Sequence, residues 1–248
     1  MPNLNKANRQ VCDVDIRDLA TKKPYLFFDT ANTTTQNISS DAVYATAKGA
    51  KRIAFQNPME GTATIEAQIV PFKFYAMMAG GEIQSTAVYA DKREVKATEA
   101  GALALPKGVV TGTVFAYPVG HFGEDASLIE GEYAEGKFTA KEAEKIAVDS
   151  LYEVGYIVSR TSGVARVTLS NRTAPKAFYV TFNTVDKDEN DVLTPFKITL
   201  YKATPQRSFE LSQSSEGDPA SITMTFDVLE DKDGNLADMV EITEADEE

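Results

Sequence analysis

TATIEAQIV, residues 62–70, and SITMTFDV, residues 221–228, carry the pattern that decides the fold of this 248-residue chain. Polar and apolar residues alternate along both stretches, which is the period of a β-strand that buries one face and exposes the other to water. The polar positions are Thr62, Thr64, Glu66 and Gln68 in the first stretch and Ser221, Thr223, Thr225 and Asp227 in the second. We therefore predict two half-buried strands with Thr-rich wet faces.

A similar alternation, with more interruptions, continues through much of the chain. Further strand-like runs occupy residues 25–29, 42–46, 51–55, 86–90, 109–117, 154–159, 164–170, 177–183 and 196–202. Turn residues separate several of them, including the acidic runs 186–191 and 231–235. About ten short strands separated by turns predict a mainly β fold, an antiparallel β-sandwich or barrel.

Two segments lack this alternation and predict short flanking helices. Residues 71–79 open with Pro71 and end before a Gly-Gly pair, the usual order of helix start and stop signals. Residues 139–149 open with Thr139, and Glu142 follows three positions later, which matches a capping box. We expect one or two short helices beside the sheet.

The expected organisation is one β-rich domain over residues 24–242, with an insertion at about 91–155 that is rich in Gly, Ala and Glu. An N-terminal arm, residues 1–23, holds five cations against three acids, and residues 243–248 form an acidic tail. Neither end has apolar periodicity, so we expect both to be flexible until a partner binds. The opposite charges of the ends suggest that they join stacked copies, although charged tails are also often simply solvated.

Composition excludes several functional classes. A net charge of −12 argues against a protein that clamps nucleic acid or an anionic membrane. One Cys and one His exclude a disulfide framework and a closed zinc site. No stretch reaches the roughly eighteen apolar residues of a membrane helix, and the N-terminus lacks a signal-peptide core. We predict a soluble protein made in the cytoplasm, with no membrane contact, cofactor, metal ion or catalytic residue.

The residues that come nearest to a chemical site have ordinary explanations. In 186–191, Asp191 stands where a calcium loop needs Gly, and in 231–235 Gly234 comes one position too early. Acidic β-turns explain both runs better than calcium sites. His121 lies in a Gly-rich loop without a partner at recognisable spacing, so we interpret it as a surface histidine. No phosphate-binding glycine motif occurs.

Two longer stretches resemble the tail tube, or major tail, protein of tailed bacteriophages. GAKRIAFQNPMEGTATIEAQIVPFKFYAMMAGGEI, residues 49–83, has the order strand, turn, strand and short helix closed by two glycines. FKITLYKATPQRSFELSQSSEGDPASITMTFDVLEDKDGNLADMVEI, residues 196–242, has the closing strands, including one around Phe209 and Leu211. Together they cover about a third of the chain. The match is a pattern of elements and includes no catalytic signature.

The resemblance implies a β-sandwich with a flanking helix. Its subunits would join sheet edges into rings, expected to be hexameric, that stack into a hollow tube for genome delivery. Other copies would be the main partners, together with sheath, terminator or baseplate proteins, and DNA would pass through without specific binding. The protein would be assembled in the host cytoplasm and reside in the virion tail. Closing a barrel between subunits would remove the exposed sheet edges of a long-stranded β protein.

Within this hypothesis the two clearest strands are candidates for the tube wall. The residues expected to face the lumen are Glu66, Asp227, Thr64, Gln68, Thr223 and Thr225. The residues expected in the core, facing the helix at 71–79, are Ile65, Ile69, Met224 and Phe226. An acidic wall would keep DNA from adsorbing.

A second hypothesis is a β-sandwich binding module, such as a virion decoration or adhesin domain that recognises carbohydrate or protein. The chain has no Trp, which weakens the carbohydrate version, although Tyr and Phe can also stack on sugars. An enzyme would need an acid/base site that the sequence does not reveal. Stacked rings in an electron micrograph would favour the tube, and monomers would favour the binding module.

Overall fold

The computed structural model describes residues 5–208, 210, 217 and 219–243. The chain folds into two compact units, one comprising Met1–Glu82 and Val167–Glu248 and the other Ile83–Arg166. The second, inserted unit is wider than the expected 91–155. The reason is that its longest ladder pairs residues on both sides of that range, from Ala87 with Arg160 to Lys96 with Leu151.

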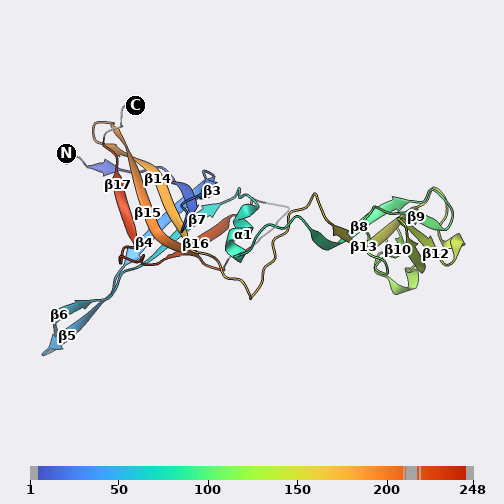
Figure 1. Cartoon of the computed structure of the whole chain (residues 1–248), viewed down its shortest axis with the longest axis horizontal. Coiled ribbons are helices and arrows are strands. Elements are labelled where there is room, and N and C mark those ends of the chain that lie inside the picture. Colours follow the sequence, from blue (N-terminus) through green and yellow to red (C-terminus); the bar gives the residue numbers. More distant parts are fainter. Residues whose placement is uncertain (1–4, 209, 211–216, 218, 244–248) are drawn as a thin grey trace. The chain divides into compact units, whose positions relative to one another are not determined.

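The first unit is built on a nine-stranded antiparallel sheet (Figure 1). The strands are β1 (Lys6–Ala7), β2 (Asp13–Asp18), β3 (Pro24–Phe28), β4 (Ala31–Ser39), β7 (Glu60–Ala67), β14 (Phe178–Asp188), β15 (Leu193–Pro205), β16 (Ile222–Val228) and β17 (Ala237–Glu241). Their order is β3-β2-β14-β15-β16-β7-β4, with β1 added beside β14 and β17 beside β15. The mainly β, antiparallel prediction is confirmed.

The sheet curls until its two ends approach each other. β3 and β4 are the first and last strands of the sheet order, yet only Asp29 and Thr30 join them in the chain. The Cys12 backbone N–H, just before β2, also donates a hydrogen bond to Thr34 Oγ1 on β4 (3.2 Å). No ladder pairs β3 with β4 in the part of the chain that the structure describes, so the barrel is not closed.

The core lies on the inner side of this curl and includes one face of helix α1 (Lys73–Ala79). Phe74, Met77 and Met78 of the helix are buried in the same cluster as the strand residues. The helix ends at Gly80, whose φ of 65° is left-handed and whose N–H donates to Met77 O (3.2 Å). The predicted helix at 71–79 is therefore confirmed, starting two residues late.

Three of the four predicted core residues are confirmed. Ile65, Met224 and Phe226 are each at most 1% exposed and belong to the cluster that contains Phe74. The prediction for Ile69 is wrong, because this side chain is 70% exposed. β7 ends at Ala67, so residue 69 no longer follows the strand alternation.

Part of the expected N-terminal arm is a core strand. β2 lies between β3 and β14, and its Val14 and Ile16 are fully buried. Asp13, Asp15 and Arg17 alternate with these buried residues, as in other half-buried strands of the sheet. The expectation of a flexible arm is therefore wrong for Asp13–Asp18.

A separate β-hairpin projects from the first unit between β4 and β7 (Figure 1). Its strands β5 (Ala42–Ala47) and β6 (Ala50–Gln56) confirm the runs predicted at 42–46 and 51–55. Lys48 and Gly49 connect them with φ values of 50° and 80°, as a two-residue hairpin turn requires.

The second unit has two three-stranded antiparallel sheets, ordered β10-β13-β8 and β11-β12-β9. The strands are β8 (Ala87–Lys96), β9 (Ala102–Ala104), β10 (Phe115–Pro118), β11 (Gly131–Ala134), β12 (Lys137–Ala140) and β13 (Leu151–Arg160), with the 3-10 turns η1 (Asp125–Ser127) and η2 (Ala143–Lys145). Buried residues from both sheets, including Leu103, Phe138 and Val154, form its own core.

The predicted helix at 139–149 is wrong. Thr139 lies inside β12, whose neighbours Phe138 and Ala140 are buried by strand alternation, and only η2 follows. β12 pairs with both β11 and β9, and these pairings outweigh a short helix with few apolar residues. α1 is thus the one α-helix among the residues described.

Two strand predictions also need correction. Residues 164–170 form no strand, and only Arg166 makes a single bridge, to Gln84. In the run at 109–117, Val109 makes a single bridge, to Val158, and the rest is a loop until β10 begins at Phe115. The strand expected around Phe209 and Leu211 lies outside the described residues, and the other predicted runs overlap strands of the structure.

Candidate functional site

The β7–β16 ladder brings the predicted wall residues together. Thr64 lies opposite Thr225, and Glu66 lies opposite Thr223. Asp227 shares this face, because it lies opposite Thr62. The side chains alternate with the buried set, so all point away from the core. Gln68 comes one residue after the end of β7, where its Nε2 donates to Pro219 O (3.1 Å).

The same polar surface continues onto β4, a strand that sequence analysis missed. Thr33 lies opposite Glu66, Thr35 opposite Thr64, and Asn37 opposite Thr62, and all three β4 residues are exposed. The alternation of ANTTTQNIS is hidden because its inward residues include Thr34 and Gln36. A search for polar residues at period two would have found it.

On the other side the surface continues across β15, β14 and β2. Thr204 lies opposite Asp227, and Thr199 lies opposite Thr181 with their hydroxyl oxygens 3.4 Å apart. We call the polar part of this outward surface the polar face; Tyr179, opposite Arg17, and Val240, opposite Lys197, lie on the same side and are not counted in it. It consists of Thr33, Thr35, Asn37, Thr62, Thr64, Glu66, Thr223, Thr225, Asp227, Thr204, Lys197, Thr199, Thr181, Asn183, Asp13, Asp15 and Arg17.

The polar face carries four acids and two cations among its seventeen residues. Arg17 is paired with Asp15 (Nη2 to Oδ2, 2.6 Å), and this neighbour raises the pKa of the guanidinium. Asp227 accepts a hydrogen bond from Gln206 Nε2 (2.6 Å) and, within the described residues, has no cationic partner. Glu66 is likewise exposed. The surface is therefore Thr-rich with hydrated acids, suited to contact with water and weakly repulsive to anions.

A comparison with known protein families assigns the fold. The sequence profile of the YomU/Tube protein family matches residues 9–242, nearly the whole chain. The chain belongs to the YomU/Tube family. A search of curated proteins found no match.

Membership of this phage-derived tail tube family confirms the resemblance seen in the sequence, and it makes the chain a phage tube-like structural protein and a virion component. Within the described residues no helix is long and apolar enough to cross a membrane. The YomU/Tube family match also includes β2, β4, β5 and nearly all of the second unit, which lie outside the two stretches that carry the resemblance.

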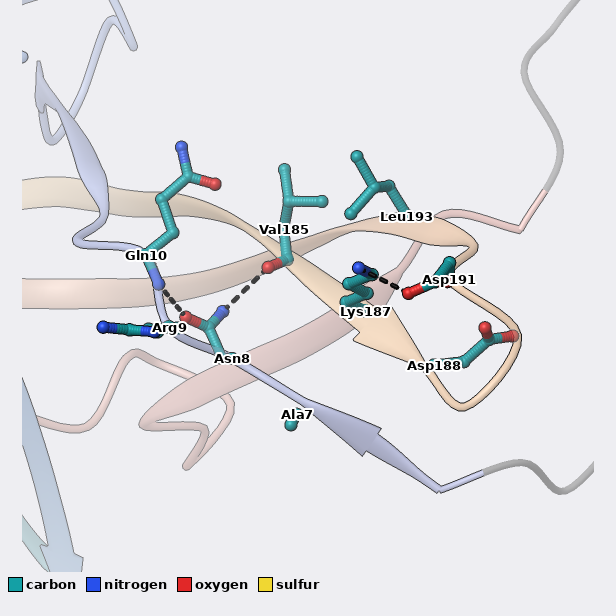
Figure 2. Close-up of a pocket in the computed structure, with 9 residues that line it drawn as sticks. All are labelled: Ala7, Asn8, Arg9, Gln10, Val185, Lys187, Asp188, Asp191 and Leu193. Carbon is teal, nitrogen blue, oxygen red and sulfur yellow. Dashed lines mark hydrogen bonds and ion pairs between the residues drawn. The ribbon is translucent and has the colours of Figure 1, made fainter.

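A groove of about 560 Å³ lies between the N-terminal segment and the β14–β15 turn of this YomU/Tube family member (Figure 2). Asn8 closes one side, because its Nδ2 donates to Thr184 Oγ1 (2.9 Å) and Val185 O (3.2 Å). Figure 2 shows Val185 and Leu193 projecting from the same side of the turn, while Lys187 pairs with Asp191 (2.5 Å). The groove thus has an apolar floor and charged walls.

The N-terminal segment is held against the C-terminal strand of the same chain. Lys6 Nζ forms an ion pair with Glu241 on β17 and donates to Thr194 Oγ1 (3.2 Å). The basic N-terminal segment and the acidic C-terminal region are therefore already in contact within one subunit. Contact between the termini of stacked copies stays a prediction.

One carboxylate of each acidic turn is bonded within the turn itself. Asp188 Oδ1 accepts the backbone N–H groups of Asn190 (2.8 Å) and Val192 (2.9 Å). Asp231 Oδ1 accepts those of Asp233 (2.9 Å) and Asn235 (2.8 Å), and the Asn235 bond lowers the pKa of Asp231. Both acids therefore act as turn caps.

In the second unit, His121 Nδ1 lies 2.7 Å from Glu124 Oε2, and both side chains are exposed. The next residue, Phe122, packs over Gly155 of β13, where an added Cβ would lie 2.6 Å from its ring. The loop is held by Glu153, which pairs with Lys92 (2.7 Å) and accepts the Gly120 N–H (3.3 Å). These contacts explain how the loop is positioned.

Proposed function

We propose that this chain is the subunit of a phage tail tube, whose copies join into rings that stack to form a hollow channel for genome delivery. The observation that supports this is the polar face. Strand residues far apart in the sequence form one Thr-rich surface across six strands of a sheet whose end strands are unpaired. Such a surface suits the wall of a water-filled channel better than it suits a dry interface.

The edge of the sheet supports ring formation. β4 is the last strand, and its nine residues include neither a charge nor a proline. Proteins that remain monomeric usually protect such an edge with charges, prolines or a covering segment. On the proposed tube, the β4 edge pairs with the sheet of the next copy, and repetition around a ring closes a barrel shared by all copies, hexameric in our proposal.

The electrostatics agree with DNA passage. The chain has a net charge of −12, and Glu66 and Asp227 place exposed carboxylates on the polar face. Because DNA binding requires cations that neutralise phosphates, such a wall guides DNA without holding it. Sheath, terminator or baseplate proteins are the further partners that we propose for the assembled tube.

Imaging the concentrated protein by negative-stain electron microscopy tests assembly. Stacked rings or tubes are the expected result. A chain that stays monomeric at every concentration would contradict the proposal and favour a binding module.

Cysteine labelling tests which face lines the channel. In a Cys12→Ala background, Thr223→Cys introduces one thiol on the polar face. A small maleimide should label tubes and free subunits alike, whereas a maleimide coupled to a large polymer should label only free subunits. Equal labelling of both by the large reagent would show that the polar face does not line the lumen.

A further inference from the structure

The β5–β6 hairpin carries an apolar stripe that none of the described residues of its own subunit covers. Val43 lies opposite Phe55, and Ala45 lies opposite Ile53, so these four side chains share one face. Val43 and Phe55 are each 59% exposed and Ile53 is 57% exposed. A two-stranded hairpin standing alone is at best marginally stable in water. The stripe therefore needs a partner.

The hairpin also has the opposite charge to the rest of the chain. Residues 42–56 contain Lys48, Lys51 and Arg52 and no acid, a charge of +3. Since the whole chain carries −12, the remaining residues carry −15 (−12 minus 3). A surface with this charge is attracted to another copy of the same acidic protein.

The β14–β15 turn has the complementary character. Residues 186–191 contain four acids and one Lys, a charge of −3. Val192 and Leu193 follow directly and are 55% and 65% exposed. Leu193 and Val185 also line the groove shown in Figure 2. The turn thus offers an apolar surface with acids beside it, while the hairpin offers an apolar stripe with cations at its tip.

We propose that the β5–β6 hairpin of one copy docks on residues 185–193 and their groove in a second copy. The proposal rests on the proposed function and names the contact that joins tube subunits. Figure 1 shows the hairpin and the top of β14 and β15 well apart within the first unit. Contact between two different surfaces is head-to-tail, so each copy accepts one neighbour and reaches another, which builds closed rings or continuing stacks.

The occupant is a second copy because each chain carries both halves of the contact: a hairpin of charge +3, and a turn of charge −3 whose groove is also lined by Arg9. Pairing the termini cannot replace this contact, since Lys6 and Glu241 are already paired within one subunit. Added salt should weaken the docking, because exposed charges are screened beyond about 10 Å at 0.1 M.

Charge reversal tests the pairing. Lys48→Glu with Arg52→Glu, and separately Glu189→Lys with Asp191→Lys, should each raise the concentration needed for assembly about tenfold or more. The chain that carries all four substitutions should recover assembly, because the attraction is restored with the signs exchanged. Matched thermal unfolding curves confirm that these exposed positions leave the fold intact. Assembly of either reversed variant at the wild-type concentration, or no recovery in the fourfold variant, would overturn the docking.

A crosslinking measurement keeps the test independent of these variants. A photoreactive phenylalanine analogue replaces Phe55 in ¹⁵N-labelled chains, which are mixed with unlabelled chains before irradiation. Crosslinks to residues 185–193 of unlabelled chains are expected, whereas the same analogue at Tyr44, on the other face of the hairpin, should give few. Tubes that crosslink elsewhere overturn the docking and leave the tube function standing. A wild-type chain that never assembles overturns both.

Discussion

Thr64 and Thr225 lie directly opposite each other in the β7–β16 ladder, with their hydroxyl oxygens 3.3 Å apart, although 161 positions separate them in the chain. This pair belongs to a register of seven paired positions, from Ile222 opposite Ala67 to Val228 opposite Gly61. Shifting the pairing of β16 by one residue would expose Phe226 to water and turn Asp227 toward the core. The polar face and the core are thus two consequences of one pairing.

Phe226→Ala should lower the free energy of unfolding by about 3 to 5 kcal/mol, because the ring is fully buried and its removal leaves a cavity. Thr225→Ala, one residue away on the polar face, is the matched control and should change stability by about 0.5 kcal/mol or less. Urea unfolding measures both. Similar losses in the two variants would mean that both faces of β16 are buried.

Gly80→Ala should destabilise the first unit. An added Cβ would lie 2.2 Å from Ala174 O, and the residue also has a left-handed φ of 65°. Gly49→Ala separates the steric clash from the left-handed φ, because Gly49 has a φ of 80° but nothing within 4 Å of the added Cβ. The control should lose only about 1 kcal/mol, and Gly80→Ala clearly more. Equal melting temperatures of the two variants would show that the end of α1 accommodates the added Cβ without loss of stability.

Glu66→Lys with Asp227→Lys should leave folding and tube assembly nearly unchanged, because both carboxylates are exposed on the polar face. DNA delivery, measured as infectivity of phage carrying the variant, should fall because cations on the wall attract phosphates. Glu66→Gln with Asp227→Asn removes the acids without adding cations and should have the smaller effect. Normal infectivity of the Lys variant would remove these residues from the channel wall.

Deleting residues 1–9 should give a folded protein that assembles poorly. The deletion removes the Lys6–Glu241 pair and the Asn8 hydrogen bonds but keeps β2, whose Val14 belongs to the core. Deleting residues 1–15 would also remove Val14 and should instead unfold the first unit. Circular dichroism checks folding and light scattering checks assembly. If the 10–248 chain forms tubes at the normal rate, residues 1–9 do not contribute to the contacts between subunits.

Acid should loosen the loop around Gly120 of the second unit, which Glu153 of β13 holds in place. The Lys92 ammonium, chiefly, and the Gly120 N–H hold the pKa of Glu153 below its ordinary value of 4.5. Ionised Glu153 therefore stabilises the folded state fully above pH 4.5, and this contribution is lost as the pH falls through the lowered folded pKa. Glu153→Gln should be less stable at pH 7 and should lose less stability than the wild type as the pH falls below 4.5. Identical pH profiles would contradict this role.

Several features of the fold follow from the sequence alone. The alternation in 62–70 and 221–228 assigns Ile65, Met224 and Phe226 to the core and Glu66 and Asp227 to water, because neighbouring side chains of any strand point to opposite faces. The α1 helix is also local, since its end depends on a glycine that adopts a left-handed φ. Five of the six predicted wall residues lie on the shared face. They could be assigned from the sequence because alternate residues of a strand point to the same side, whichever strand lies beside it.

The tertiary structure decided the rest. β4 contains Thr34 and Gln36 at inward positions and becomes a strand because β7 offers it a ladder, not because its own residues bury well. Thr139 fits a helix cap, yet β12 pairs on both sides and keeps it extended. Local residues set which face of a segment avoids water, whereas hydrogen bonds and burial shared between distant segments determine whether it becomes a strand and which strand it meets.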